Sequence, residues 1–238
     1  MEHSFLRTYV SVDCVVFGFD KNQLNVLLVQ RNSLPSNGKG LKLPGSLLYQ
    51  PEDADAGAYR VLNELTGIKK ITLRQFKSFT SPKRIADSDD DAWLETTYHT
   101  KFDRLITIAY LSLGKINRKL NIGSKYATAA WYPVSKLPQM PFDHNQIVEE
   151  ALDEIRRWVE MEPAILFELL PIKFTATELR HLYEAVYHRK YDVRNFHKKI
   201  AALDYIVVLD EKQEGVSHRA ARYYKFDRII YNKRRLGI

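Results

Sequence analysis

Cysteine is almost absent from this chain. Cys14 is the only cysteine among 238 residues, so no disulfide can form within one molecule. Small secreted domains that depend on disulfides carry several cysteine pairs. The composition therefore excludes a disulfide framework and suits the reducing environment of the cytoplasm, where we expect the protein to reside.

Long apolar runs, internal repeats and low-complexity tracts are also missing. The apolar run at 10–19 is interrupted by Asp13, and it lacks the basic flank and the small-residue cleavage site of a signal peptide. No stretch is long enough to span a bilayer. We therefore expect a globular protein without a membrane partner, large enough for one big domain or two modest ones.

Excess positive charge is scarce in the first two thirds of the chain and concentrated in the last third. Residues 163–238 hold 15 Lys and Arg against 9 Asp and Glu, a net charge of +6, whereas residues 1–162 hold 21 against 20, a net charge of +1. Such asymmetry suggests a polyanion-binding module joined to a nearly neutral one. A basic surface that only aids solubility is the alternative.

The first two thirds read as a mixture of strands and helices. Strands are predicted at 10–19 and 24–30, which form a hairpin, and again at 71–79 and 104–113. A turn around Pro44-Gly45 leads to a helix that begins near residues 51–53 and ends at Gly67. A second helix, capped by Asp143, is predicted over 144–161.

The segment 81–102 is a polar excursion between two strands. It carries Asp87, Asp89, Asp90 and Asp91, but it lacks the spacing, glycine and terminal glutamate of an EF-hand loop. We interpret it as a solvated flexible loop rather than a metal site. Since Pro163 ends the preceding helical pattern, a domain boundary is predicted near residue 160, which gives domains of 1–160 and 161–238.

The last third reads as three helices followed by a β-hairpin, the order of a winged helix-turn-helix. Helices are predicted at 164–170, at 179–187 behind the capping box of Thr175 and Glu178, and at 193–203 behind Asp192. The hairpin strands are predicted at 205–210 and 221–226.

The third of these helices has the properties of a DNA recognition helix. Its apolar residues Phe196, Ile200 and Leu203 form a seam for docking, and the other side is polar. Arg194 could bond a guanine edge and Asn195 an adenine edge. The other predicted DNA contacts, most of them to phosphate, are Thr175, Thr177, His197, Lys198, Lys199, His218 and Arg219. The alternatives are solvated surface charges and, for Asn195, a hydrogen bond within the helix-turn-helix.

Residues 44–68 resemble a metal-hydrolase motif whose metal ligands are incomplete. The Nudix box reads G-x5-E-x7-R-E-U-x-E-E-x-G-U, with U an apolar residue. The residues that fit, with one extra residue between the first two, are Gly45, Glu52, Arg60, Leu62, Glu64, Gly67 and Ile68. The two other glutamates of the box are replaced by Val61 and Leu65.

The replacements remove the carboxylates that a metal would need. Positions 61, 64 and 65 project toward one side of a helix, and only Glu64 remains there as an oxygen ligand. A hard cation requires several oxygen ligands. We therefore predict no metal, no cofactor, no catalytic residue and no pyrophosphohydrolase activity. In the simpler interpretation, Val61 and Leu65 pack and Glu64 pairs with Arg60 one turn earlier.

With the basic C-terminal module, the chain resembles the Nudix-related transcriptional regulators, whose members include NrtR. The matching stretches are Leu27-Leu28-Val29-Gln30-Arg31, Leu43-Pro44-Gly45, the box, Ile108-Ala109-Tyr110-Leu111, Phe142-Asp143-His144, Phe174-Thr175, Glu178-Leu179 and Arg194-Asn195-Phe196. The resemblance implies an α+β fold: an N-terminal Nudix-like α/β/α sandwich with a mixed sheet, followed by a winged helix-turn-helix. It also implies a homodimeric repressor that binds a palindromic operator and a small-molecule effector.

Departures from the family pattern bear on the effector. Ser46 replaces a second glycine, Leu41 replaces a tryptophan, Lys42 adds a charge, and the acidic segment 81–102 would repel a pyrophosphate. They favour a pentose such as L-arabinose, to which one branch of the family responds, over ADP-ribose, to which many members respond. The predicted effector residues are Ser11, Asp13, Lys42 and Gly45.

Three alternatives stay open at this point. Asp13 could instead pair with a buried lysine or arginine, because an unpaired carboxylate in an apolar strand is costly. The protein could be an active Nudix hydrolase whose turnover depends on Glu64. Finally, the basic module could bind nucleic acid without sequence preference.

Overall fold

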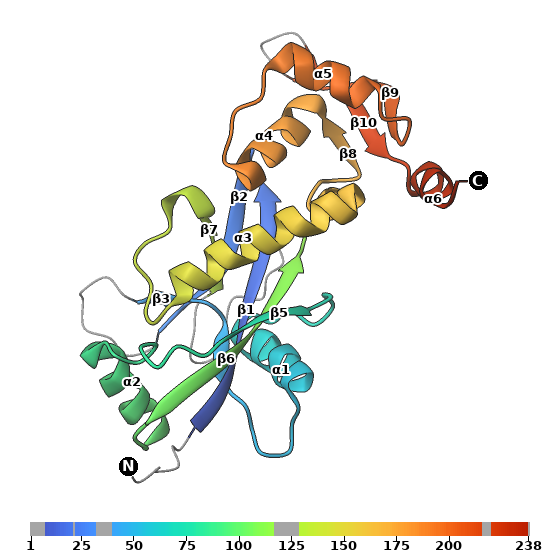
Figure 1. Ribbon diagram of the computed structural model, residues 1–238. Helices are drawn as coiled ribbons and strands as arrows, with labels where there is room; N and C mark the ends of the chain where they lie inside the picture. The colour runs from blue at the N-terminus through green and yellow to red at the C-terminus, as the bar shows by residue number, and fades with distance from the viewer. Residues whose placement is uncertain (1–7, 21, 32–39, 117–128, 216–219, 238) are drawn as a thin grey trace. The chain divides into compact units, whose positions relative to one another are not determined.

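A long mixed β-sheet organises the N-terminal part of the protein (Figure 1). The computed structural model describes residues 8–20, 22–31, 40–116, 129–215 and 220–237. The chain divides into two compact units, one of Met1–Gly18 and Asn25–Glu154 and one of Phe19–Leu24 and Ile155–Ile238. The division falls inside a helix, whereas the sequence predicted a boundary near residue 160.

Seven strands form the sheet of the first unit, and its centre is a parallel pair. The strands are β1 (Thr8–Asp20), β2 (Gln23–Gln30), β3 (Leu41–Lys42), β4 (Gly45–Leu47), β5 (Arg74–Phe79), β6 (Arg104–Leu113) and β7 (Ala129–Pro133). Their order is β3-β2-β1-β6-β5, with β4 paired to β1 and β7 to β2. β1 runs parallel to β6 in a register from Thr8↔Arg104 to Phe17↔Leu113. The predicted hairpin and the predicted strand at 104–113 are confirmed.

Helices cover both faces of this sheet, because alternate residues of β1 point to opposite sides. Val12, Cys14 and Val16 of β1 pack against helix α1 (Ala54–Thr66). The other face, which carries Asp13, is crossed by helix α3 (His144–Met161) in Figure 1. Helix α2 (Ser88–Tyr98) contributes side chains to the same pocket as Asp13.

Helix α1 confirms the prediction for the degenerate box. Asp53 caps it by accepting from the backbone N–H of Ala56, and Gly67 ends it in the left-handed region at φ 76°. Val61, which stands where the box has a glutamate, is fully buried in the core, and Leu65 packs against the same cluster. The helix therefore uses these two positions for packing.

Segment 81–102 is not the flexible loop that was predicted. Residues 88–98 form α2, capped by Asp87. Asp90 is buried and accepts from Arg31 Nη1 and Nη2 at 3.1 Å, while its second oxygen accepts from the Phe142 N–H at 2.6 Å. The Arg31 guanidinium also lies 4.2 Å from the ring centre of Trp93. The aspartate run was misjudged because Arg31, 59 residues away in sequence, neutralises Asp90.

The second unit is a winged helix with two elements that the sequence analysis missed. The 3-10 segment η2 (Pro163–Glu168) precedes the helices α4 (Ala176–Tyr187) and α5 (Val193–Ala201) and the strands β9 (Ile206–Lys212) and β10 (Arg222–Phe226). The missed elements are β8 (Lys173–Thr175), which makes the sheet β8-β10-β9, and the C-terminal helix α6 (Arg228–Leu236). A short 3-10 segment, η1 (Val134–Lys136), follows β7 in the first unit.

Aromatic rings form much of the core of this second unit. Phe167 stacks on Phe226 with ring centres 4.4 Å apart, and Tyr205 meets both rings edge-on. Tyr231 of α6 packs on Tyr205 at 5.1 Å. None of the helices within the described ranges has the length and apolar character needed to cross a bilayer.

The buried Arg31–Asp90 pair should stabilise the N-terminal unit strongly. We expect Asp90→Ala to lower its free energy of unfolding by about 3–5 kcal/mol, because the substitution leaves a buried guanidinium without its counter-charge. Urea titration checks this. Glu95→Ala, which removes an exposed carboxylate from the same helix, should change the stability by less than about 0.5 kcal/mol. Equal effects of the two substitutions would contradict the assignment.

Candidate effector pocket and nucleic-acid interface

The remaining carboxylates of the degenerate box are engaged by one arginine. Arg60 Nε donates to Glu52 at 2.8 Å, and its Nη1 donates to Glu64 at 3.1 Å. Hydrogen bonding from Arg60 is the main cause that lowers the pKa of Glu52. The predicted pairing of Glu64 with Arg60 is therefore confirmed. Within the described ranges, no group of three or more His, Cys, Asp or Glu side chains could hold a metal ion.

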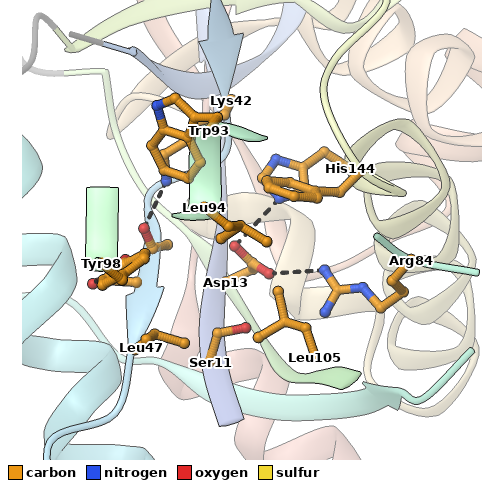
Figure 2. A pocket seen from close by; sticks show the side chains of 13 residues that line it. Ser11, Asp13, Lys42, Leu47, Arg84, Trp93, Leu94, Tyr98, Leu105 and His144 are labelled. Atoms are coloured by element: carbon orange, nitrogen blue, oxygen red, sulfur yellow. Dashed lines mark hydrogen bonds and ion pairs between the residues drawn. The ribbon is translucent and has the colours of Figure 1, made fainter. Parts of the chain in front are cut away.

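A pocket lies on the face of the sheet opposite α1, and all four predicted effector residues line it (Figure 2). It encloses a cavity of about 30 Å³. The lining residues are Ser11, Asp13, Lys42, Gly45, Ser46, Leu47, Arg84, Trp93, Leu94, Tyr98, Leu105, Phe142 and His144. The sequence thus predicted the strand side of the pocket but missed the side formed by residues 84–98 and 142–144.

Asp13 is the centre of the polar contacts in this pocket. Thr107 Oγ1 donates to Asp13 Oδ2 at 2.7 Å, and Arg84 Nη2 lies 3.5 Å from the same oxygen. His144 Nε2 lies 3.5 Å from Oδ1, so the carboxylate sits between these two side chains in Figure 2. Burial would raise the pKa of Asp13, but these groups and Lys42 together lower it. The alternative that Asp13 pairs with a buried arginine is confirmed.

His144 is held as a neutral ring. Its Nδ1 accepts from the Leu43 N–H at 3.1 Å, which leaves the ring proton on Nε2, facing Asp13. Burial is the main cause that lowers the pKa of His144 to about 3, and Lys42 and Arg84 act in the same direction against the opposing charge of Asp13. The stretch Phe142-Asp143-His144, identified in the sequence as a family match, therefore supplies two pocket residues.

Gly45 and Lys42 shape the wall beside Asp13. A Cβ atom at position 45 would collide with Asp13 Oδ1, so only glycine leaves room for the carboxylate. Lys42 Nζ donates to the carbonyl of Gly45 at 2.6 Å and to that of Leu43 at 3.2 Å. Burial lowers the pKa of Lys42 to about 8, partly offset by Asp13.

Arg84 retains an unused donor in this pocket. Its Nε donates to Asp143 at 2.8 Å and its Nη2 faces Asp13, but its buried Nη1 has no hydrogen-bond partner among the described residues. A buried donor left unsatisfied costs about 1–3 kcal/mol. An oxygen of a bound ligand would relieve this cost. Sequence reasoning missed Arg84 because its segment was interpreted as a solvated loop.

The exposed side of α5 carries most of the predicted DNA contacts. Phe196 and Ile200 are buried, and the side chains left exposed are those of Arg194, Asn195, His197, Lys198 and Lys199. Asp192 caps the helix by accepting from the Asn195 N–H at 2.9 Å. The structure therefore brings together five of the nine residues predicted to contact DNA.

The other four predicted contacts have different fates. Thr177 is exposed in the first turn of α4. Thr175 is only 2% exposed and its hydroxyl belongs to the capping box with Glu178, so the predicted phosphate contact of Thr175 is wrong. The capping box itself is confirmed. His218 and Arg219 lie outside the described residues.

Known proteins share both halves of this architecture. Residues 166–226 match the NrtR DNA-binding winged helix domain. The chain is 25% identical over 238 residues to the ADPR responsive transcriptional repressor NtrR of Acinetobacter baylyi, covering 94% of this chain and 88% of the relative.

Two solved structures show the same fold over most of the chain. Shewanella oneidensis NrtR in complex with a 27mer DNA has a TM-score of 0.63 at 23% identity, covering 92% of this chain and 93% of that one. A MutT/nudix family protein from Enterococcus faecalis has a TM-score of 0.64 at 23% identity, covering 95% and 89%.

The fold predicted from the sequence is thus confirmed: a Nudix-like domain with a mixed sheet and helices, followed by a winged helix. Together with the domain match, it gives the chain the architecture of an NrtR-like, Nudix-related transcriptional regulator. The A. baylyi relative is described as responsive to ADPR, whereas the sequence analysis favoured a pentose.

The neutral state of His144 makes the stability of the first unit depend on pH. Its pKa of about 3 lies below the 6.5 of a free histidine, so below pH 6.5 the unfolded chain binds a proton that the folded chain refuses. Stability should therefore fall by about 1.4 kcal/mol per pH unit from this residue between pH 6 and 4.

Urea unfolding of the native chain and of His144→Gln at several pH values checks this expectation. The variant should lose stability less steeply as the pH falls, by that same difference in slope. His197→Gln, a substitution on the exposed side of α5, should keep the native slope. Parallel pH profiles for the native chain and His144→Gln would contradict the neutral assignment.

Proposed function

We propose that this protein is a DNA-binding transcriptional repressor regulated by a small molecule in the pocket around Asp13. The observation that carries the proposal is the winged helix of the NrtR type, whose α5 exposes Arg194, His197 and Lys198 opposite a buried apolar seam. A recognition helix needs this combination. The A. baylyi relative, a repressor, supports the same conclusion.

The mode of binding follows from the geometry of helix-turn-helix proteins. A homodimer would place two copies of α5 about 34 Å apart on a palindromic operator. The effector would act by binding more tightly to one of two dimer arrangements, only one of which fits DNA.

ADP-ribose is the first candidate effector. It is supported by the relative that responds to ADPR. Arg84 and Lys42 bring positive charge to the pocket, and the unpartnered Nη1 of Arg84 could donate to a phosphate oxygen.

A pentose such as L-arabinose is the second candidate, favoured by the size and lining of the cavity. A cavity of about 30 Å³ holds one or two waters, so any effector must displace part of the wall, and ADP-ribose much more of it than a pentose. Trp93, Tyr98 and Phe142 offer aromatic faces, and the buried carboxylate of Asp13 accepts from hydroxyl groups.

Base reading by Arg194 can be tested on duplex DNA that the native protein selects from a random pool. We expect Arg194→Ala to weaken binding by about 1–3 kcal/mol and to relax the preference at one position of each half-site. Lys198→Ala should weaken binding to all sequences alike. Fluorescence anisotropy measures both. Failure of the native chain to prefer any sequence over unrelated DNA would contradict the proposed function.

The effector can be identified by its effect on the melting temperature, since a ligand of the native state raises it. We expect ADP-ribose or L-arabinose to raise the melting temperature of the native chain, and we expect Asp13→Asn to abolish the rise. A rise with ADP-ribose alone selects the first candidate, and a rise with L-arabinose alone selects the second. Glu95→Ala, at an exposed site on α2, should respond like the native chain. If neither compound shifts the native chain, both candidates are wrong.

A further inference from the structure

A second hollow lies in the winged-helix unit, at the turn between α4 and α5. Its volume of about 370 Å³ falls within the range of ligand sites, about 300–1,000 Å³. It could admit a phosphodiester with its neighbouring sugar. The lining residues are Arg189, Lys190, Tyr191, Asp192, Asn195, Phe196 and Lys199.

The hollow is positively charged. Three of its lining residues are cations, whereas Asp192 is the only acid among them. The Asp192 carboxylate is already engaged as the N-cap of α5. An anion would therefore be attracted to this hollow.

Arg189 is the cation of this group that is best prepared to bind an anion. Its Nε donates to the Tyr191 hydroxyl at 2.8 Å, and its guanidinium lies 4.7 Å from the centre of the Tyr191 ring. No carboxylate of the described residues forms an ion pair with it, so its Nη1 and Nη2 donors remain available for an oxygen ligand. Lys190, in contrast, is paired with Glu184 at 3.2 Å.

A buried acid fixes the turn on which Arg189 stands. Glu184 of α4 is 7% exposed and accepts from the Tyr191 N–H at 3.1 Å as well as from Lys190 and Arg180. Burial opposes its charge, but these hydrogen bonds lower the pKa of Glu184 to about 2. The hollow is thus preformed, which reduces the entropy cost of binding.

The hollow flanks the side of α5 that would enter the major groove. At about 100° per residue, Arg194 and Lys198 point roughly opposite the buried seam of Phe196 and Ile200. Asn195 and Lys199 are rotated to one side of Arg194 and Lys198, and both line the hollow. A helix in the groove therefore brings the hollow toward the phosphates at the groove edge.

We propose that this hollow binds one phosphodiester of the DNA backbone in each half-site, with Arg189 as its main ligand and Lys199 on the opposite rim. This inference rests on the proposed function. The contact positions α5 without reading a base, because phosphates carry no sequence information.

The test compares Arg189→Gln with the native chain on the duplex that the native chain selects. Anisotropy is measured between 50 and 200 mM salt. We expect the slope of log K against log salt concentration to fall by about one per half-site contact, with the order of sequence preference unchanged. Lys233→Gln, which removes an exposed cation from α6 outside the hollow, should keep the native slope.

Phosphate-ethylation interference gives an independent readout. One phosphate in each half-site should lose its interference signal in Arg189→Gln while the others keep theirs. Matching melting temperatures establish that the variant is folded. Lys199→Gln, on the opposite rim, provides a second variant should Arg189→Gln fail to fold.

The outcomes separate this inference from the proposed function. If the native chain does not bind DNA selectively, both fall. If it does, but Arg189→Gln and Lys199→Gln retain the native slope and interference pattern, only the phosphodiester site is wrong. A melting temperature raised by inorganic phosphate in the native chain and not in Arg189→Gln, with DNA binding unaffected, would assign the hollow to a free anion instead.

Discussion

The N-terminal unit depends on one buried carboxylate in the middle of its central strand. The charge of Asp13 would be costly in an apolar strand, yet Thr107, Arg84 and His144 compensate for it from three separate segments. These partners bring the end of β5, strand β6 and the start of α3 to one point. The pocket is arranged around that point, and Gly45 is required because any larger residue would take the space of the carboxylate.

Buried charges hold two further elements whose sequences are weakly patterned. Helix α2 has little amphipathic character, and its attachment comes from Asp90, which meets Arg31 in the interior. In the winged helix, Glu184 fixes the turn before α5 through the Tyr191 N–H. In each case one acid inside the protein determines where a functional segment lies. The hydrophobic core alone would leave both segments underdetermined.

Elements with strong local signals could be predicted from the sequence. The bounds of β6 and α3 and the capping box of α4 agree with the predictions because periodicity and caps are local properties. Helix α2 could not be predicted, since its stability depends on a partner 59 residues away. The same limit applies to the pocket: Ser11 and Asp13 interrupt an apolar strand and are visible in the sequence, whereas Arg84 reaches the site only through the fold.

The packing of α1 has a consequence for the history of the fold. Val61 is sealed in the core against β1, and Leu65 lies beside it. Returning a glutamate to position 61 would place a carboxylate among Val12, Cys14 and Leu27, where the described structure offers no counter-charge and no water to solvate it. Each single step back toward hydrolysis would first weaken the protein that carries it. The loss of the metal ligands has therefore become a one-way change, protected by the same close packing that stabilises the domain.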